Sequence, residues 1–294
     1  MQEGRLKVFD GVWVAGDALV DITRSGVLEE KVVGGGAVNT ARVLGNLGIP
    51  TWLIACLSED EDGKLIENSL KQSGVYLDYV HRINLPTATA ILSVDKEGKA
   101  NYEFNLEDTA TFKFSDWLPK FQPKILHIGS LASILEPGAS ALFSWANLLK
   151  SLIIFDPNVR PMVLQDKERY LSNFKRWASI SRIVKLSEED LQWLEIEVDS
   201  IQELGVEIVI LTRGSKGIYA KTRSFEVEIA AVPISVVDTV GAGDTVGAVV
   251  AEAMYLNSSM DMESLKKMLE RAALAASITC GKKGAVPVTR EELS

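Results

Sequence analysis

The residue types best suited to chemistry are concentrated in one short stretch, Asp238-Thr239-Val240-Gly241-Ala242-Gly243-Asp244. It follows an apolar run, 230–237, and precedes residues 245–255, where apolar side chains recur at helical spacing. The stretch is therefore predicted to open a helix. At a helix N-terminus several backbone N–H groups lack partners and the helix dipole is positive, and small residues let a phosphate approach these donors closely. The backbone of Gly241, Ala242 and Gly243 is thus a candidate anion hole.

The acid that ends this stretch, Asp244, has two interpretations. A carboxylate beside an anion hole can accept a proton from a hydroxyl while the backbone donors stabilise charge on a phosphoryl group. Aspartate is also one of the residues that most often cap a helix N-terminus. Taken alone, the residues leave both roles open.

Two other glycine-rich segments could bind a ligand. Gly34-Gly35-Gly36 precedes a helix predicted over Ala37–Leu47, either to hold a ligand or only to make a tight strand-to-helix turn. A dinucleotide fingerprint starting at Gly34 would need glycine at position 39, where Asn39 stands, so a Rossmann site is disfavoured and a site for sugar hydroxyls is favoured. Thr212–Gly217 lies between two apolar runs and by itself predicts a hairpin turn. No GxxxxGK[ST] occurs in the chain, which excludes a Walker-type nucleotide site.

The elements that must position these residues alternate between apolar runs and amphipathic segments, which predicts an α/β fold with a parallel sheet covered by helices. The apolar runs are Thr51–Cys56, Ile125–Ile128, Leu152–Phe155, Arg182–Lys185 and Ile208–Leu211. Residues 88–94 and 99–104 read instead as a hairpin with a glycine turn at 95–98. Together with strand-like residues at 18–23 and 30–33, this hairpin predicts either a small β-sheet lid over the ligand crevice or edge strands of the main sheet.

Composition narrows the classes of partner and compartment. The 294 residues are 47% hydrophobic and carry a formal net charge of −9, which argues against the basic face that binding to nucleic acid requires. Two cysteines without a CxxC pair indicate neither a disulfide framework nor a zinc site. No signal peptide and no apolar stretch of 18 residues is recognised. We therefore expect a cytoplasmic protein that binds neither nucleic acid nor membrane.

Four stretches, in this order, resemble the signatures of the ribokinase-like carbohydrate kinases, also called the PfkB family, over essentially the full chain. They are Gly34–Asn39, Asp156–Arg160 for the family's DPNxR, Thr212–Gly217 for TxGxxG, and Asp238–Asp244 for DTxGAGD. The last of these is highly specific. The resemblance implies a single ribokinase-like kinase domain over residues 1–294, a three-layer sandwich with a central, mostly parallel sheet. Its small β-sheet lid would use strands within 18–33 and 88–104.

The resemblance also implies an activity, the ATP-dependent phosphorylation of a sugar hydroxyl, and a role for each matching residue. Asp244 would be the catalytic base, and the amides of Gly241, Ala242 and Gly243 the anion hole. The residues matching the family's sugar and phosphate contacts are Asp17, Gly34, Gly35, Asn39 and Arg160. On the nucleotide side the matches are Thr212, Gly214 and Gly217, with adenine beside the helix around 272–277.

One family motif departs from its pattern. The NxxE motif, associated with magnesium and phosphate, appears here as Lys185-Leu186-Ser187-Glu188, so Glu188 remains the metal candidate while Lys185 replaces the asparagine and weakens the metal assignment. Residues 184–191, 126–131 and 280–285 are similar to sequences of the family's fructokinases, and in that subgroup Lys185 is expected to reach ATP phosphates. His127 lies in an apolar run, where a hydrogen-bonded core residue is the expected role, and it is assigned no chemistry.

We therefore expect a kinase that uses ATP and Mg²⁺ on a small sugar, with fructose favoured. A kinase for 2-keto-3-deoxygluconate, ribose or a nucleoside stays open, as does a non-catalytic sugar or nucleotide sensor on the same fold. The resemblance further implies a potassium site formed by the backbone around Asp238 and Val240 with residues 277–284. It also implies a homodimer formed through the lid strands.

Overall fold

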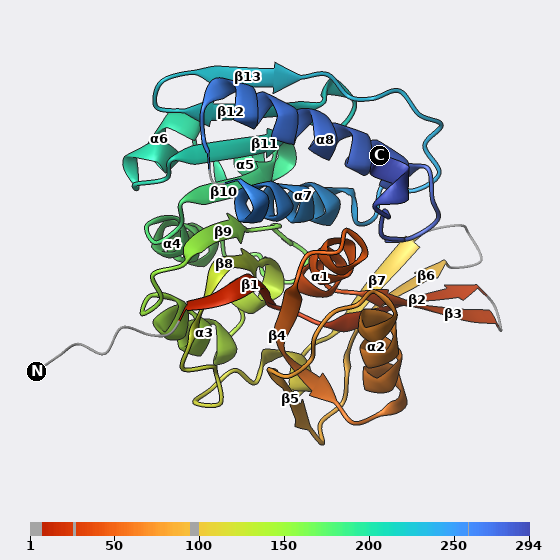
Figure 1. Cartoon of the computed structure of the whole chain (residues 1–294). Helices are drawn as coiled ribbons and strands as arrows, with labels where there is room; N and C mark the ends of the chain where they lie inside the picture. The colour runs from red at the N-terminus through yellow and green to blue at the C-terminus, as the bar shows by residue number, and fades with distance from the viewer. Residues whose placement is uncertain (1–7, 26–27, 95–99, 258) are drawn as a thin grey trace, which may run out of the picture.

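A computed structural model describes residues 8–25, 28–94, 100–257 and 259–294. Within them, a nine-stranded sheet has the order β13-β12-β11-β10-β9-β8-β1-β4-β5 (Figure 1). The strands from β11 to β5 in this order pair in parallel, whereas β12 and β13 are antiparallel additions at one edge. The strands are β1 (Val8–Ala15), β4 (Thr51–Ser58), β5 (Val80–Ile83), β8 (Gln122–Gly129), β9 (Leu152–Asp156), β10 (Ile183–Ser187), β11 (Ile208–Thr212), β12 (Ile218–Thr222) and β13 (Glu226–Ile229).

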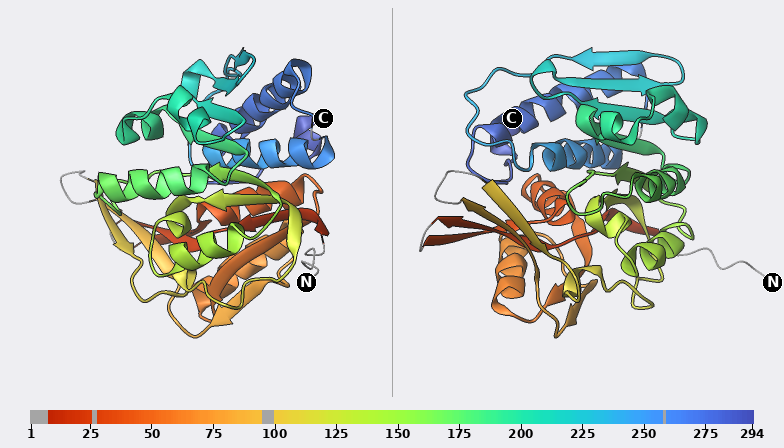
Figure 2. Two further views of the ribbon diagram at one scale, coloured as in Figure 1. Left: turned by 90° about the vertical axis from the view of Figure 1, so that its left-hand side faces the viewer. Right: turned by 180° about the vertical axis from the view of Figure 1, so that it is seen from behind.

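Helices cover both faces of this sheet, as Figures 1 and 2 show. Side chains of β1 alternate between the two layers, because Val12 and Val14 join one hydrophobic cluster while Trp13 and Ala15 join the other. The first cluster includes residues of α1 (Gly36–Asn46), α2 (Glu61–Gln72), α7 (Ala242–Leu256) and α8 (Met262–Cys280). The second includes residues of α3 (Gly138–Ala146), α4 (Lys167–Ala178), α5 (Glu188–Leu194) and α6 (Val198–Glu203). Burial on both faces explains the continuous apolar runs, and the predicted three-layer α/β fold is confirmed.

A second sheet projects from one end of the molecule (Figures 1 and 2). Its order is β3-β2-β6-β7, with β2 (Leu19–Ser25), β3 (Leu28–Gly34), β6 (Ala88–Val94) and β7 (Ala100–Asn105). These strands pair with one another and not with any described strand of the main sheet, so the alternative of ordinary edge strands is wrong. The glycine turn predicted at 95–98 lies outside the described residues.

The apolar run 230–237 has no regular structure, although it precedes the helix as expected. It contains no strand, and Val236 and Val237 are 64% and 62% exposed. Its end is held by Cys280, whose carbonyl oxygen accepts from the N–H groups of Val237 and Asp238 at 2.8 and 3.2 Å. The run therefore serves as a connection that brings the glycine loop to the end of α8.

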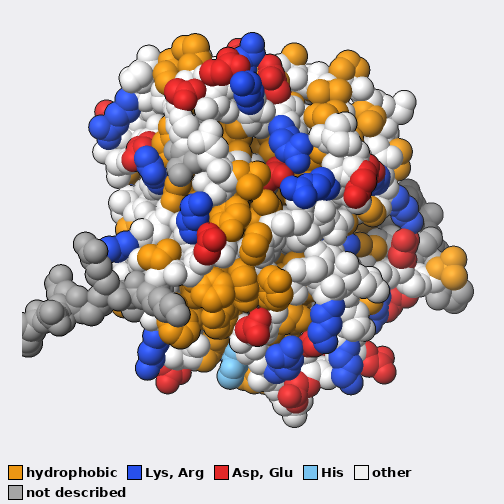
Figure 3. All heavy atoms as spheres, in the orientation of Figure 1, with side chains coloured by type: hydrophobic (Ala, Val, Ile, Leu, Met, Phe, Trp, Pro, Cys, Tyr) orange, Lys and Arg blue, Asp and Glu red, His pale blue; other side chains and the backbone are white. Residues whose placement is uncertain are grey.

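The surface in the orientation of Figure 1 mixes the two signs of charge (Figure 3). Lysine and arginine side chains alternate there with aspartate and glutamate, in keeping with the many exposed ion pairs, such as Arg182 with Glu207. Among the helices formed by the described residues, none has the length and apolar character needed to span a bilayer.

Candidate active site

The glycine loop begins α7, as the sequence predicts. Gly241 is the N-cap residue and has a left-handed backbone, with φ of 80°, and a methyl group there would lie 2.8 Å from the Ala285 side chain. The N–H of Ala242 donates to the carbonyl of Thr239 at 3.3 Å, whereas those of Gly241 and Gly243 donate to no described backbone acceptor. The start of the helix thus presents free donors and a positive dipole end to an anion.

Asp244 lies in the first turn of α7 and does not cap it. Its Oδ2 accepts a hydrogen bond from Asn39 Nδ2 at 2.9 Å, and the α7 N-terminus has no side-chain cap. The cap interpretation is therefore wrong. Burial raises the pKa of Asp244 to about 6, and the nearby Asp156 carboxylate adds to this, while Asn39, Lys185 and Arg160 oppose it. The result is a carboxylate that is ionised at neutral pH and more basic than an ordinary aspartate.

Asn39 reaches Asp244 because α1 and α7 pack side by side (Figure 1). The second predicted glycine cluster ends β3 at Gly34 and starts α1 at Gly36, with Gly35 as the N-cap residue at φ of 99°. A side chain on Gly35 would overlap the backbone carbonyl of Asp17. The glycines thus allow the chain to turn tightly beside Asp17, which accounts for their predicted place in the site.

Asp17 follows β1 at the carboxyl end of the sheet and is 1% exposed. Its Oδ2 accepts from the Gly36 N–H at 3.2 Å and from Ser130 Oγ at 3.5 Å, while its Oδ1 is buried and has no partner among the described residues. Burial raises the pKa of Asp17 above its usual value. A buried acceptor without a partner is costly unless a ligand or water hydrogen-bonds to it.

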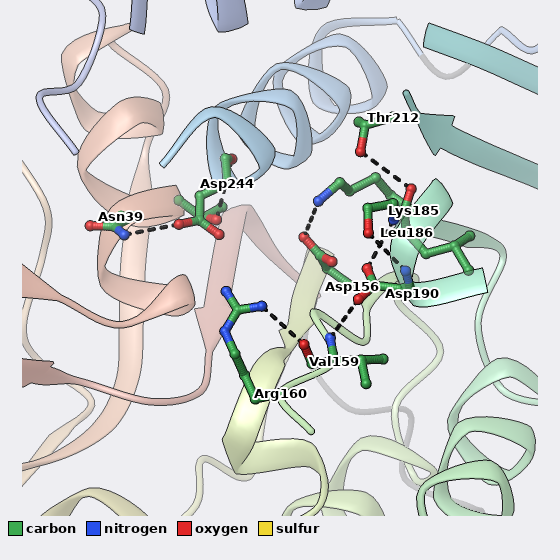
Figure 4. Close-up of polar contacts among 11 residues, drawn as sticks. Asn39, Asp156, Val159, Arg160, Lys185, Leu186, Asp190, Thr212 and Asp244 are labelled. Atoms are coloured by element: carbon green, nitrogen blue, oxygen red, sulfur yellow. Dashed lines mark hydrogen bonds and ion pairs between the residues drawn. The ribbon is translucent and has the colours of Figure 1, made fainter. Parts of the chain in front are cut away.

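Arg160 comes from the loop after β9, and its guanidinium group points toward Asp244 (Figure 4). The backbone N–H of Arg160 donates to the Tyr170 hydroxyl at 2.8 Å. The preceding residue, Val159, donates its N–H to Asp190 Oδ1 at 2.9 Å, and Asp190 Oδ2 accepts from the Ser187 N–H, also at 2.9 Å. Asp190 thereby joins the loop after β9 to the start of α5 and fixes the position of Arg160.

Lys185, the residue that departs from the family motif, forms a buried ion pair. Its Nζ lies 2.7 Å from Asp156 Oδ2, and each side chain is only 5% exposed (Figure 4). A methyl group on Gly243 would be 3.1 Å from the same Nζ, so the ammonium group lies beside the anion hole as well. The Asp156 carboxylate raises the pKa of Lys185 against the opposing effect of burial, and the lysine stays charged.

The predicted nucleotide residues lie beyond Lys185, at the end of β11. Thr212 Oγ1 donates to the Leu186 carbonyl at 3.5 Å, and the predicted turn 212–217 joins β11 to antiparallel β12. Gly214 and Gly217 both have positive φ, 54° and 94°, which explains the glycines of this motif. At the start of α5, Glu188 pairs with Lys216 at 3.0 Å on the surface. Among the described residues no group of three or more histidine, cysteine or acidic side chains forms a ready metal site.

A cleft of about 780 Å³ lies between the carboxyl end of the main sheet and the small sheet. Of the predicted residues, it is lined by Asp17, Gly35, Asn39, Arg160, Gly241, Gly243 and Asp244. Gly34, Ala242, Lys185, Glu188, Thr212, Gly214 and Gly217 are not on its walls. The structure thus brings the sugar and anion-hole candidates together in one cleft, with the nucleotide candidates outside it.

His127 differs from its expected role in one respect. It is buried in the core as expected, but neither ring nitrogen has a hydrogen-bond partner among the described residues. Burial lowers the pKa of His127 to about 3, with a contribution from Lys185, so the ring is neutral. It packs against Gly247 of α7 and lines a small hollow that also includes Asp156 and Asp244.

Three acidic residues of the site were not among the predicted site residues: Asp21, Asp156 and Asp190. Asp156 belongs to the recognised Asp156–Arg160 segment, and its position directly after an apolar run was a signal that could have identified it. Asp190 stands three residues after Ser187, a spacing typical of a capping box, which the structure contains. Asp21 gave no such signal, because one acid in a half-buried strand is unremarkable.

Comparison with known proteins gives independent evidence on the family and the fold of this chain. The profile of the "pfkB family carbohydrate kinase" matches residues 27–291. A fructokinase of Rhizobium leguminosarum bv. trifolii is 31% identical over 87% of this chain and 83% of its own length. A fructokinase of Salmonella typhimurium is 30% identical over 94% of both. The crystal structure of a Xylella fastidiosa fructokinase with bound ATP superposes with a TM-score of 0.86 at 22% identity, covering 97% of each chain, which confirms the fold. This chain therefore belongs to the pfkB family of carbohydrate kinases.

Proposed function

We propose that this protein is a fructokinase, which transfers the γ-phosphoryl group of ATP to a hydroxyl of fructose. The observation that carries the proposal is Asp244, buried at the start of α7, held by Asn39 and facing the cleft beside free backbone donors. The choice of fructose is supported by the two fructokinases that share about 30% identity with most of the chain. Use of ATP is supported by the ATP-bound relative of the same fold.

In this proposal Asp244 accepts the proton of the attacking hydroxyl. With a pKa of about 6, Asp244 is ionised at pH 7 and is a stronger base than a solvent-exposed aspartate. The free N–H groups at the start of α7 stabilise charge on the transferred phosphoryl group, and Lys185 and Arg160 add positive charge on either side of it. Catalysis of this kind depends on positioning and electrostatics rather than on covalent intermediates.

Asp17 and Asn39 are the proposed contacts to sugar hydroxyls. Each has a buried oxygen, Asp17 Oδ1 and Asn39 Oδ1, without a partner among the described residues. Gly34 and Gly35 allow the backbone to approach the sugar closely. The strands of the small sheet form the proposed lid, and Lys283 at the cleft already pairs with Glu30 of β3 at 2.8 Å. Closure over the sugar would exclude water that could otherwise hydrolyse ATP.

We assign ATP to the groove outside the cleft, along Thr212, Gly214 and Gly217. Magnesium is held in proteins by one or two carboxylates together with substrate phosphates. Glu188 fits such a site because its side chain is 30% exposed and its ion-pair partner, Lys216, is 66% exposed on the surface. The metal would neutralise charge on the nucleotide phosphates. Potassium would be bound by backbone carbonyls of the loop at 238–240 and of residues 277–284, which are the last turn of α8 and the loop that follows it. Asp238 joins the two segments by accepting from the Gly284 N–H at 2.9 Å.

The proposed oligomer is a homodimer through the small sheet, whose outer strands are β3 and β7. Outer strands carry unpaired backbone groups and readily pair with another chain. Light scattering on the purified protein tests this, and a monomeric mass at micromolar concentration would rule it out.

The activity is tested by ADP release with fructose, ribose, 2-keto-3-deoxygluconate and nucleosides as acceptors. We expect the highest kcat/KM with fructose, and a loss of roughly 10²- to 10⁴-fold in kcat for Asp244→Ala, because that is the usual contribution of a general base. Absence of ADP release with every acceptor would overturn the proposal. Binding of fructose without turnover would instead identify a sensor.

A further inference from the structure

His127 is buried near the carboxyl end of the main sheet, beside the helix that carries Asp244. It belongs to β8, is 3% exposed, and lies between Val14 of β1 and Ile154 of β9 in the register of the sheet. Its ring packs against Gly247 of α7, where a methyl group would lie only 2.7 Å from Nε2. Gly247 therefore provides the room that the imidazole ring occupies, one turn after Asp244 along the helix.

Three buried polar atoms at this place have no hydrogen-bond partner among the described residues: His127 Nδ1, His127 Nε2 and Asp156 Oδ1. The pKa of His127, lowered to about 3 by burial and by Lys185, keeps the ring neutral. A neutral imidazole still has one N–H donor and one nitrogen acceptor, and burying them without hydrogen bonds costs free energy. The Asp156 carboxylate is only half satisfied, because it is Oδ2 that pairs with Lys185 at 2.7 Å (Figure 4).

His127 and Asp156 line the same small hollow, and its volume is about 10 Å³. Asp244 lines this hollow as well. A space of about 10–15 Å³ is enough for one water molecule, provided that polar groups surround it, whereas apolar cavities stay dry. With an imidazole and two carboxylates on its walls, the hollow has the size and the lining of a site for a single ordered water.

The hydrogen-bonding capacity of these three side chains matches one water molecule. An ionised carboxylate only accepts, so Asp156 and Asp244 can each accept one of the two hydrogens of the water. The water oxygen then needs a donor, and the neutral ring of His127 supplies one without adding a charge. Asn158 lines both the hollow and the cleft, so its amide is also available to a ligand, whereas His127 does not line the cleft.

The charged groups in this part of the site come from β9, β10, α5 and the loops after β1 and β9: Asp156, Lys185, Asp190, Asp17 and Arg160. Burial and then Asp156 raise the pKa of Asp244. Asn39 of α1, Lys185 and Arg160 lower it. A water that donates to both carboxylates favours their ionised forms and so opposes the effect of Asp156 on Asp244.

We propose that His127 is a positioning residue, which holds one ordered water against the carboxylates of Asp156 and Asp244. This inference rests on the proposed function, in which Asp244 is the base, and adds to it a residue that supports the base from the core. The water helps to keep Asp244 ionised, and it holds the second oxygen of Asp156 while Lys185 holds the first. His127 acts only through these carboxylates and contacts neither substrate.

The test compares the pH dependence of kcat/KM for fructose in wild type and His127→Leu. Leucine fills much of the same space but cannot donate, so we expect the acid limb of the profile to move about one pH unit toward higher pH. At the pH where wild type has half its maximal kcat/KM, the variant should have about a fifth of the wild-type value, and about two pH units higher the two should agree within about twofold. A change in packing alone would instead lower the rate at every pH and leave the limb in place.

Two amide variants locate the donor on the ring. Asparagine places its amide near the position of Nδ1, and glutamine places its amide near that of Nε2, so one of His127→Asn and His127→Gln should keep the wild-type acid limb. His81→Leu is the matched control, because it makes the same change at the chain's other histidine, which lies in the edge strand β5 and stacks on Trp117. His81→Leu should leave the acid limb in place.

A high-resolution crystal structure of the wild type gives a second measurement. We expect one water within hydrogen-bond distance of His127, Asp156 Oδ1 and Asp244. The inference is wrong if the wild type has no water there, if His127→Leu keeps the wild-type acid limb with normal thermal unfolding, or if both amide variants move the limb as far as leucine does. If His127→Leu does not fold, the wild-type water and the amide variants decide. If wild type phosphorylates no sugar, the proposed function fails, and the crystal structure still tests the water site.

Discussion

Replacing Asp244 by asparagine should make the free protein more stable while lowering its kcat by roughly 10²- to 10⁴-fold. Burial raises the pKa of Asp244 from 3.8 to about 6. Ionising this side chain therefore costs more free energy in the folded protein than in the unfolded chain, and the difference lowers the free energy of unfolding. Each factor of ten in this equilibrium is worth about 1.4 kcal/mol, which gives a cost of about 3 kcal/mol at pH 7.5. Asparagine carries no charge, and its side-chain oxygen can still accept the bond from Asn39 Nδ2.

The sign of the pH dependence follows from the raised pKa. Wild type regains the lost stability as the pH falls from about 6 toward 3.8, because Asp244 then becomes protonated in the folded protein. Urea unfolding of the ligand-free proteins should therefore show Asp244→Asn to be more stable by about 3 kcal/mol at pH 7.5 and nearly equal to wild type at pH 4.

Asp238→Asn provides the control, since it is the same chemical change in the same loop. Both oxygens of Asp238 accept bonds from backbone N–H groups, those of Val240 and Gly284, so the amide loses an acceptor and should destabilise the protein by about 1–3 kcal/mol. The reasoning is refuted if Asp244→Asn is no more stable than wild type at pH 7.5. It is equally refuted if its advantage is the same at pH 4.

Three further outcomes follow from the site. The kcat/KM for sugar phosphorylation should fall about tenfold per pH unit below about pH 6, where Asp244 becomes protonated, and a profile that is flat between pH 5 and 7 would exclude Asp244 as the base. Lys185→Met leaves Asp156 buried without its cation and should lower the free energy of unfolding by about 3–5 kcal/mol in urea titrations, whereas an unchanged midpoint would show that the pair is dispensable. Gly35→Ala and Gly205→Ala both impose a positive φ on alanine, but only the alanine at position 35 would overlap another backbone group. Gly35→Ala should therefore lower the thermal unfolding midpoint more than Gly205→Ala does, and equal midpoints would contradict this.

Much of the fold could be predicted because both faces of the main sheet are buried. The runs at 51–56, 125–128, 152–155 and 208–211 all lie inside strands, and the helix predicted over 37–47 is α1, shifted by one residue. The apolar run 230–237 differs from these runs, and it shows that apolar composition alone does not distinguish a strand from an exposed connection. Its valines lie outside any sheet, where no neighbouring strand buries them.

The site was predictable where a motif fixes the backbone and unpredictable where it depends on tertiary contact. Positive φ at Gly35, Gly217 and Gly241 explains glycines that the sequence already marked. The partners of these loops could not be derived in the same way, because Asn39 and Asp244 are 205 positions apart and meet only through the packing of α1 on α7. The place of Asp21 in the cleft could not be derived from the sequence for a similar reason, since its carboxyl group occupies the space that the missing side chain of Gly34 leaves in the adjacent strand.

The lysine at position 185 is best understood from the charges around it. Asp156 is 3% exposed, and its carboxylate lies close enough to add to the raised pKa of Asp244, which burial raises most. Lys185 binds Asp156 directly and also lowers the pKa of Asp244, which keeps that residue ionised near neutral pH. A neutral asparagine at position 185 would leave Asp156 without its cation. The departure from the family motif therefore balances a charge within the site, and the same ammonium group remains next to Gly243, where a phosphate would bind.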